Sequence, residues 1–139
     1  MRSECFLDTN VLIYAATGKQ DEPAKFAIAD HLVTTRKFGT SAQILAEFYV
    51  VATAKVAVPL SPTEIDEWIE VLSDQPFTAL DSRLVRSGVI LARRYRIKYY
   101  DAAHVAAAER LGAPVFYTED LNHGQFYGSV QAINPFLES

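Results

Sequence analysis

Near its start the chain reads Cys5-Phe6-Leu7-Asp8-Thr9-Asn10-Val11-Leu12-Ile13-Tyr14. The apolar residues before Asp8 predict a buried strand over about residues 4–7. Residues 8–10 are all of types that cap helices, so the apolar residues after them predict a helix beginning near Val11. A strand that passes directly into a helix is typical of α/β folds, and here it leaves an acid at the end of the strand.

The rest of the chain repeats this alternation of short apolar runs and longer helical patterns. Further strands are predicted over about residues 38–40, 77–80, 114–118 and 130–133, the last of them short. Further helices are predicted after residue 23, after Ser41, after the start signal Ser61-Pro62-Thr63-Glu64, over residues 82–95 and over residues 101–111. Strands that alternate with helices indicate parallel connections, so the sequence predicts an α/β fold with a parallel sheet.

Length and composition limit the class of protein. A chain of 139 residues, half of them hydrophobic, suits one globular domain, which we expect to span residues 1–139. Its formal charge of −4 argues against a general nucleic-acid coat but not against an enzyme with an acidic metal site. Cys5 is the only cysteine, so no intramolecular disulfide or zinc site is expected, and its apolar setting predicts a buried, unreactive thiol. Acids interrupt the apolar stretches, so we expect no signal peptide, no membrane contact and a cytoplasmic location.

Four acids occupy positions that suggest a shared site. Asp8 and Asp120 follow apolar runs, Asp101 is predicted to open an alanine-rich helix, and Glu47 lies inside an otherwise apolar helix. Strand ends and helix starts meet at one edge of a parallel sheet, and Glu47 would reach that edge from the side. Carboxylates in apolar surroundings are unfavourable unless a charge offsets them. The pattern therefore predicts a divalent cation bound by oxygen ligands, Mg²⁺ or Mn²⁺, which is typical of phosphodiester chemistry.

Each acid also has an ordinary explanation when it is considered alone. Asp8 and Asp101 are good helix caps, and Asp120 is a common turn residue. Glu47 is the hardest of the four to explain in this way, because it would be an ordinary surface residue only if its helix exposes one edge to solvent. The joint pattern favours the metal cluster. His104 lies three residues after Asp101, but a lone histidine on an apolar helix is more often packed than a ligand, so we assign it no role.

The segments that carry the acids resemble, in the same order, the four motifs of the PIN domain, the fold of many small metal-dependent ribonucleases. They are FLDTNVLIY (residues 6–14), SAQILAE (41–47), YDAAHVAAA (100–108) and YTEDL (117–121). The resemblance covers nearly the whole chain and implies a three-layer α/β/α sandwich around a mostly parallel sheet of four to five strands. The small size is similar to that of the VapC-like toxins of bacterial and archaeal toxin–antitoxin pairs.

This resemblance implies a metal-dependent endoribonuclease that hydrolyses RNA with a metal-activated water. Asp8 is expected to be the central metal ligand, and Asp101 and Asp120 to complete one or two metal positions. Glu47 is expected either to bind the metal directly or to hold a metal-bound water. These four acids are the expected catalytic residues.

Neighbouring polar side chains are expected to fix the geometry of these carboxylates. Thr9, Asn10 and Thr118 are the candidates, and the resemblance favours Asn10 and Thr118. Glu119 directly precedes Asp120, and because adjacent side chains at a strand end point apart, we expect Glu119 outside the site.

The resemblance also implies partners: an RNA substrate, a cognate antitoxin protein that covers the acidic site, and a second copy in a homodimer. Trp68 and residues 48–51 are candidate interface residues, with core packing as the alternative. The basic residues between 93 and 98 suit either RNA phosphates or a solvated helix end, and Tyr99 and Tyr100 suit either base stacking or packing.

Two other functions remain open at this point. A catalytically inactive PIN-like module that binds RNA or serves as a scaffold should lack one or more acids, whereas all four are present. A phosphatase of the haloacid-dehalogenase type also begins with an aspartate after the first strand, but its chemistry requires a second aspartate two residues later. Asn10 occupies that position here.

Overall fold

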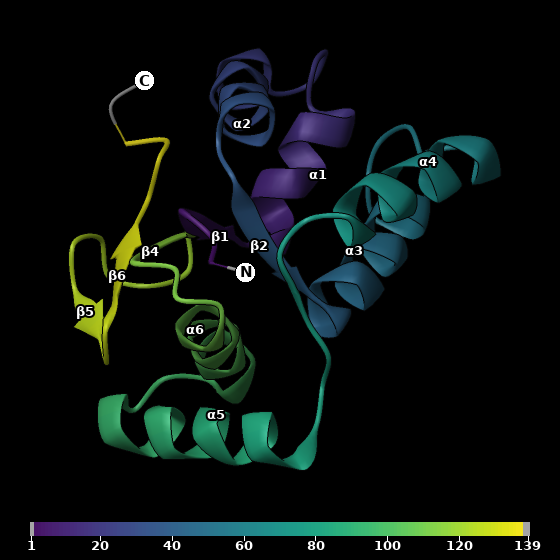
Figure 1. Cartoon of the computed structure of the whole chain (residues 1–139). Coiled ribbons are helices and arrows are strands. Elements are labelled where there is room, and N and C mark those ends of the chain that lie inside the picture. The colour runs from purple at the N-terminus through teal and green to yellow at the C-terminus, as the bar shows by residue number, and fades with distance from the viewer. Residues whose placement is uncertain (1, 138–139) are drawn as a thin grey trace.

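The computed structural model describes residues 2–137, which form six helices around a six-stranded sheet (Figure 1). The strands are β1 (Cys5–Leu7), β2 (Phe38–Ser41), β3 (Phe77–Thr78), β4 (Val115–Tyr117), β5 (Phe126–Tyr127) and β6 (Val130–Ile133). The helices are α1 (Thr9–Thr17), α2 (Pro23–Thr35), α3 (Ala42–Ala54), α4 (Pro62–Ser73), α5 (Ser82–Tyr95) and α6 (Tyr99–Arg110). No helix among these residues is both long and apolar enough to cross a membrane.

The sheet has the strand order β3-β2-β1-β4-β6-β5. All neighbouring strands are parallel except β5 and β6. β1 lies in the middle between β2 and β4, with Leu7 opposite Tyr117. The residues that follow β1 and β4 are therefore neighbours at the carboxyl edge of the sheet, where open parallel sheets place their sites.

Helices cover both faces of the sheet, as expected for a three-layer α/β/α sandwich. In Figure 1, α1 and α2 lie on one side of the strands, and α6, with α5 packed against it, lies on the other. The pair α3 and α4 flanks α1. β1 and the middle of α6 are almost completely buried, so the core runs along the centre of the sheet and beneath α6.

Local sequence signals account for several helix ends. Ser61 forms the predicted capping box with Glu64, and Pro62 is the first residue of α4. Asp81 caps α5 by accepting a hydrogen bond from the backbone of Leu84. Gly112, with φ of +71°, ends α6 in the left-handed conformation that glycine adopts most readily.

The structure differs from the sequence prediction at three points. α1 begins at Thr9 and not near Val11, because Asp8 is itself the N-cap. α6 begins at Tyr99, so Asp101 lies within its first turn and does not open the helix. The sheet has a sixth strand, β5, because Phe126 and Tyr127 pair antiparallel with β6.

Candidate active site

Asp8 lies at the carboxyl end of β1 and is only 5% exposed. Its Oδ1 accepts a hydrogen bond of 2.8 Å from the backbone N–H of Thr9, and its Oδ2 accepts one of 2.7 Å from the hydroxyl of Thr118. The Thr118 oxygen in turn accepts the backbone N–H of Asp120 at 3.1 Å. One threonine thus links the acids that follow the neighbouring strands β1 and β4.

Glu47 reaches the same place from α3, with its side chain one-third exposed. Its Oε1 accepts the Thr9 hydroxyl at 2.6 Å, and its Oε2 accepts the side-chain amide of Gln43 at 3.0 Å. Gln43 lies one helical turn earlier on the same face of α3, as the spacing of four residues predicts. Glu47 is therefore held in one orientation by its neighbours.

His104 is the site residue that sequence reasoning missed. Its ring is buried on α6, and its Nε2 lies 3.1 Å from Glu47 Oε1 and 4.0 Å from Asp8 Oδ1. Within residues 2–137, only Asp8, Glu47 and His104 place three potential metal-ligand atoms within 4.8 Å of one another. Its spacing of three residues from Asp101 places it on the same helix face, but that spacing alone does not show that α3 brings Glu47 beside it.

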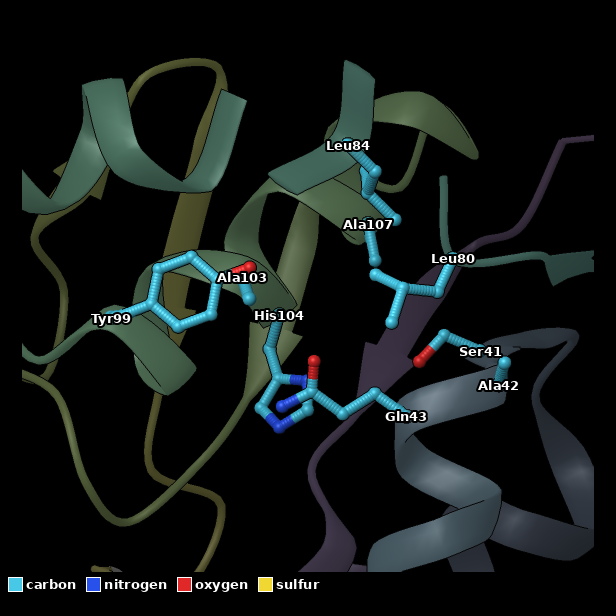
Figure 2. Close-up of a pocket in the computed structure, with 9 residues that line it drawn as sticks. All are labelled: Ser41, Ala42, Gln43, Leu80, Leu84, Tyr99, Ala103, His104 and Ala107. Atoms are coloured by element: carbon cyan, nitrogen blue, oxygen red, sulfur yellow. The ribbon is translucent and has the colours of Figure 1, made fainter. Parts of the chain in front are cut away.

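Figure 2 shows His104 extending from α6 beside Gln43 at the start of α3. The gap between these helices has room for about 10 Å³ and is lined mainly by apolar groups such as Leu80, Leu84 and Ala107. A space of this size holds one water molecule at most. It is therefore a packing gap behind the histidine and not a ligand site.

Asp101 and Asp120 complete the acidic cluster. Both line an open hollow together with Asp8, Glu47 and His104. Asp101 is partly buried in the first turn of α6, whereas Asp120 is exposed after β4. The structure therefore brings all four acids predicted from the sequence to one hollow, with Asp8 at its buried end and Asp120 at its rim.

The other residues predicted in or near the site differ in whether they contact its carboxylates. Thr9 and Thr118 hydrogen-bond the carboxylates, whereas Asn10 lines the hollow but makes no side-chain hydrogen bond to them in the described part of the chain. Thr9 makes its contact because it lies next to the N-cap of α1 and its hydroxyl faces α3. The preference for Asn10 stays a prediction. Glu119 points away, as expected: it binds Lys25 at 2.7 Å and the Tyr14 hydroxyl at 2.9 Å.

Burial and neighbouring charges shift the pKa values in this site. Burial raises the pKa of Asp8 to about 6, although His104 and Thr118 act in the opposite direction. Burial also raises the pKa of Asp101, and the charge of Asp120 adds to this shift. Burial opposes ionisation of Glu47 too, but its hydrogen bond to His104, the charge of that histidine and the Thr9 hydroxyl outweigh it and lower the pKa to about 2.

The same interactions act on His104. Burial alone would lower its pKa, but the hydrogen bond to Glu47 and the charge of Asp8 outweigh burial, and the pKa is raised. An ionised Glu47 and a protonated His104 therefore stabilise one another. For Asp8, the charge of His104 at 4.0 Å and the hydrogen bond from Thr118 offset the effect of burial only in part, so its pKa stays raised.

These donors fit a hard divalent cation. Asp8, Asp101 and Asp120 offer carboxylate oxygens around an open hollow, and a cation would offset the burial and repulsion that raise the pKa values of Asp8 and Asp101. Glu47 Oε1 already accepts hydrogen bonds from Thr9 and His104, so its lone pairs are occupied. Asp8, Asp101 and Asp120 thus line the hollow with carboxylates that could hold a cation, and of these three only Asp8 belongs to the group of ligand atoms within 4.8 Å of one another.

Comparisons with known proteins agree with the fold described above. Residues 5–128 match the sequence profile of the PIN domain. The fold is similar to VapC20 of Mycobacterium tuberculosis, described as a sarcin–ricin loop cleaving toxin, with 16% identity, a TM-score of 0.65 and coverage of 84% of this chain and 89% of that one. It is also similar to a toxin–antitoxin complex from Klebsiella pneumoniae, with 20% identity, a TM-score of 0.68 and coverage of 94% and 97%. No functionally curated protein matches the sequence. Because the profile covers most of the chain and the four motif acids share one hollow, this protein belongs to the PIN-domain family.

Proposed function

We propose that this protein is an endoribonuclease that depends on Mg²⁺ or Mn²⁺. The observation that carries the proposal is the convergence of Asp8, Glu47, Asp101 and Asp120 on one hollow at the carboxyl edge of the sheet. Four carboxylates within one hollow repel each other and any phosphate, so an RNA backbone can approach them only if cations are bound. Membership of the PIN-domain family, which includes many metal-dependent nucleases, supports the same conclusion.

Asp8, Asp101 and Asp120 would hold the cation, which would lower the pKa of a bound water and neutralise charge on the phosphate. The side chains of the protein supply the geometry. Thr9 and Thr118 fix both oxygens of Asp8, and their hydrogen bonds keep the carboxylate facing the hollow. Because these contacts are already formed, little rearrangement is required before the reaction.

Glu47 is suited to orienting the attacking water. A carboxylate with a pKa of about 2 remains ionised at neutral pH and is a weak base, so it accepts a hydrogen bond more readily than it keeps a proton. Its Oε2 accepts one hydrogen bond from Gln43 and has a further lone pair toward the hollow. His104 and Gln43 would thus position Glu47, and Glu47 would position the water.

We further propose that the enzyme is the toxin of a toxin–antitoxin pair in the cytoplasm. Support comes from the similarity in fold to VapC20 and to the Klebsiella complex. A cognate antitoxin protein would cover the acidic hollow, and a second copy of the chain would form a homodimer. Among the candidate interface residues, Tyr49 and Val50 are exposed, but Phe48 is fully buried against Trp68, so Phe48 belongs to the core.

A cleavage assay with mapped product ends tests the proposed activity. The purified protein is incubated with Mn²⁺ and a pool of unstructured RNAs and hairpins, including a sarcin–ricin loop because the mycobacterial neighbour is described as cleaving one. Cleavage should occur with Mn²⁺, stop in EDTA and be lost in Asp8→Asn. The matched control is Asp30→Asn, the same chemical change on the exposed face of α2. Cleavage that persists in EDTA or in Asp8→Asn would reject the proposal.

The inactive-module alternative makes the opposite prediction for metal binding and cleavage. Such a protein would bind RNA without cutting it and would show no heat of Mn²⁺ binding. The phosphatase alternative has no support from the PIN-domain match.

A further inference from the structure

A second hollow adjoins the acidic one. It lies along the connection between α5 and α6, whose course Figure 1 shows. It is lined by Arg96, Ile97, Lys98 and Leu121 and shares Asp101 and Asp120 with the acidic hollow. The side chains of Arg96 and Lys98 are exposed, and neither forms an ion pair with another residue between positions 2 and 137. Positive charge is thus available immediately beside the acids.

The basic residues between positions 93 and 98 fall into two groups that differ in their local structure. Arg93 and Arg94 lie in the last turn of α5, where cations are favoured by the helix dipole. Arg96 and Lys98 lie where local structure disfavours them. Lys98 is the N-cap of α6, makes no capping hydrogen bond and brings a positive charge to the positive end of a helix.

Arg96 is the only non-glycine residue with positive φ among the described residues, with φ of 55° and ψ of 46°. Residues with a side chain rarely adopt this left-handed conformation, and glycine or asparagine is the usual choice at such a helix end. An unfavourable backbone conformation held beside a site is an indication of function when the side chain has a use there. The Arg96 side chain lines the hollow that borders the acids.

Tyr100 continues the same segment. It is 65% exposed and lines the acidic hollow itself. Its ring contacts that of Tyr99 edge to face, with the centroids 5.3 Å apart, and Tyr99 is partly buried beside Gly88 of α5. Tyr100 therefore presents a supported aromatic surface and is not a core residue.

We propose that Arg96, Lys98 and Tyr100 form a binding rim for an unpaired RNA segment. Arg96 and Lys98 would contact backbone phosphates next to the one that is cleaved, and Tyr100 would stack on a base at the acidic hollow. Alternating cations and an exposed aromatic ring are the features that bind single-stranded nucleic acid without requiring a particular sequence. This inference rests on the proposed ribonuclease function, because it supplies the substrate contacts for the same site.

Binding is measured by fluorescence anisotropy with a labelled single-stranded RNA, in Mg²⁺ and over a series of KCl concentrations. Glu47→Gln serves as the parent so that the RNA stays intact while Asp8, Asp101 and Asp120 can still hold the cation. Arg96→Gly and Lys98→Gln should each weaken binding by about 3- to 10-fold and reduce the slope of log Kd against log salt by about 0.7. Tyr100→Ala should weaken binding by about 5-fold or more, and Tyr100→Phe should restore it.

Two features separate this role from a loss of folding. Arg96→Gly should raise the midpoint of thermal unfolding, because glycine relieves the left-handed backbone, while it weakens RNA binding. Arg86→Ala, the removal of an exposed cation on α5 outside both hollows, should leave Kd and the salt slope unchanged. A gain in stability together with a loss of binding has no explanation in a structural role alone.

The outcomes also distinguish the rim from the proposed function. If the wild-type protein cleaves RNA but the rim variants keep the parent's Kd and salt slope, the rim is wrong and the ribonuclease proposal stands. If the parent binds no RNA and the wild-type protein cleaves none, both are wrong. Equal weakening by Arg86→Ala would also overturn the rim, because any surface cation would then serve.

Discussion

The Nε2 atom of His104 on α6 lies 3.1 Å from Oε1 of Glu47 on α3. This contact connects helices that approach the acidic hollow from different sides of the molecule, and it joins a buried imidazole to a carboxylate that also accepts hydrogen bonds from Thr9 and Gln43. It keeps Glu47 ionised and oriented. The histidine thus acts on the site through another residue.

Replacing His104 should therefore change both the rate and its pH dependence. His104→Leu removes the donor and the charge that lower the pKa of Glu47, so cleavage should fall by about 10- to 100-fold and its acid limb should move to higher pH. His104→Gln retains a donor in a similar volume and should recover part of the rate. The measurement is a pH–rate profile of each variant. An unchanged profile for His104→Leu would show that the contact has no role in the reaction.

Asp8→Asn should stabilise the metal-free protein at neutral pH while it abolishes cleavage. The pKa of Asp8 is raised from 3.8 to about 6, so the folded state keeps a proton that the unfolded state releases. Stability is therefore lost as the pH rises from about 4 to about 6, and the loss remains at neutral pH. A shift of one pKa unit corresponds to about 1.4 kcal/mol, and the amide makes weaker hydrogen bonds than the carboxylate. The free energy of unfolding should therefore be about 1–3 kcal/mol higher in Asp8→Asn than in the wild type.

Urea unfolding in EDTA, repeated from acid to neutral pH, measures this difference. The two proteins should be closest at the acid end, and Asp8→Asn should become the more stable one as the pH rises. Asp30→Asn, on the exposed face of α2, should follow the wild-type curve. A variant that loses stability relative to wild type as the pH rises would contradict the assigned burial and charge of Asp8.

Glu119 and Asp120 are adjacent in sequence but should differ in function. Glu119 binds Lys25 and Tyr14, whereas Asp120 borders the hollow. Glu119→Gln should keep the cleavage rate and lower stability by no more than about 1 kcal/mol, because the ion pair with Lys25 is partly exposed. Asp120→Asn should keep the stability and lose most of the cleavage. The cleavage rate and the free energy of unfolding are measured for both variants. Loss of cleavage in Glu119→Gln but not in Asp120→Asn would contradict the prediction.

Cys5 should be unreactive in the folded protein. It is 1% exposed in β1, and burial raises the pKa of its thiol to about 11, so almost no thiolate forms at neutral pH. Alkylation by iodoacetamide, followed by mass spectrometry, should proceed only as the protein unfolds in urea. Rapid labelling of Cys5 in buffer alone would show that the central strand opens far more easily than its burial indicates.

Much of the fold could be predicted from the sequence because local sequence signals agree with the tertiary structure. The run before Asp8 is a fully buried strand, and the Ser61 capping box forms as its residue types predict. The four acids could be placed at one edge because parallel strands and helix starts share that edge. The same rule could not give the start of α6, because its N-cap, Lys98, is not a capping residue type.

Contacts between helices that are distant in sequence were not predictable from local patterns. His104 lies in an alanine-rich apolar helix, where packing was the simplest explanation, and its use depends on the approach of α3. Thr9 was ranked below Asn10 for the same reason, since only the tertiary structure shows which side chain faces Glu47. The unusual backbone of Arg96 has no sequence signal, because the usual marker of a left-handed residue is glycine.

The most direct test of the central proposal, that Asp8, Asp101 and Asp120 hold one or two divalent cations, is calorimetric titration of the RNA-free protein with Mn²⁺. Wild-type protein should show a heat of binding, and the Asn variant at each of these positions should weaken the affinity by at least about 10-fold, whereas Asp30→Asn should not. Equal Mn²⁺ affinity in the wild type and all three variants, or no binding by the wild type, would contradict the proposal.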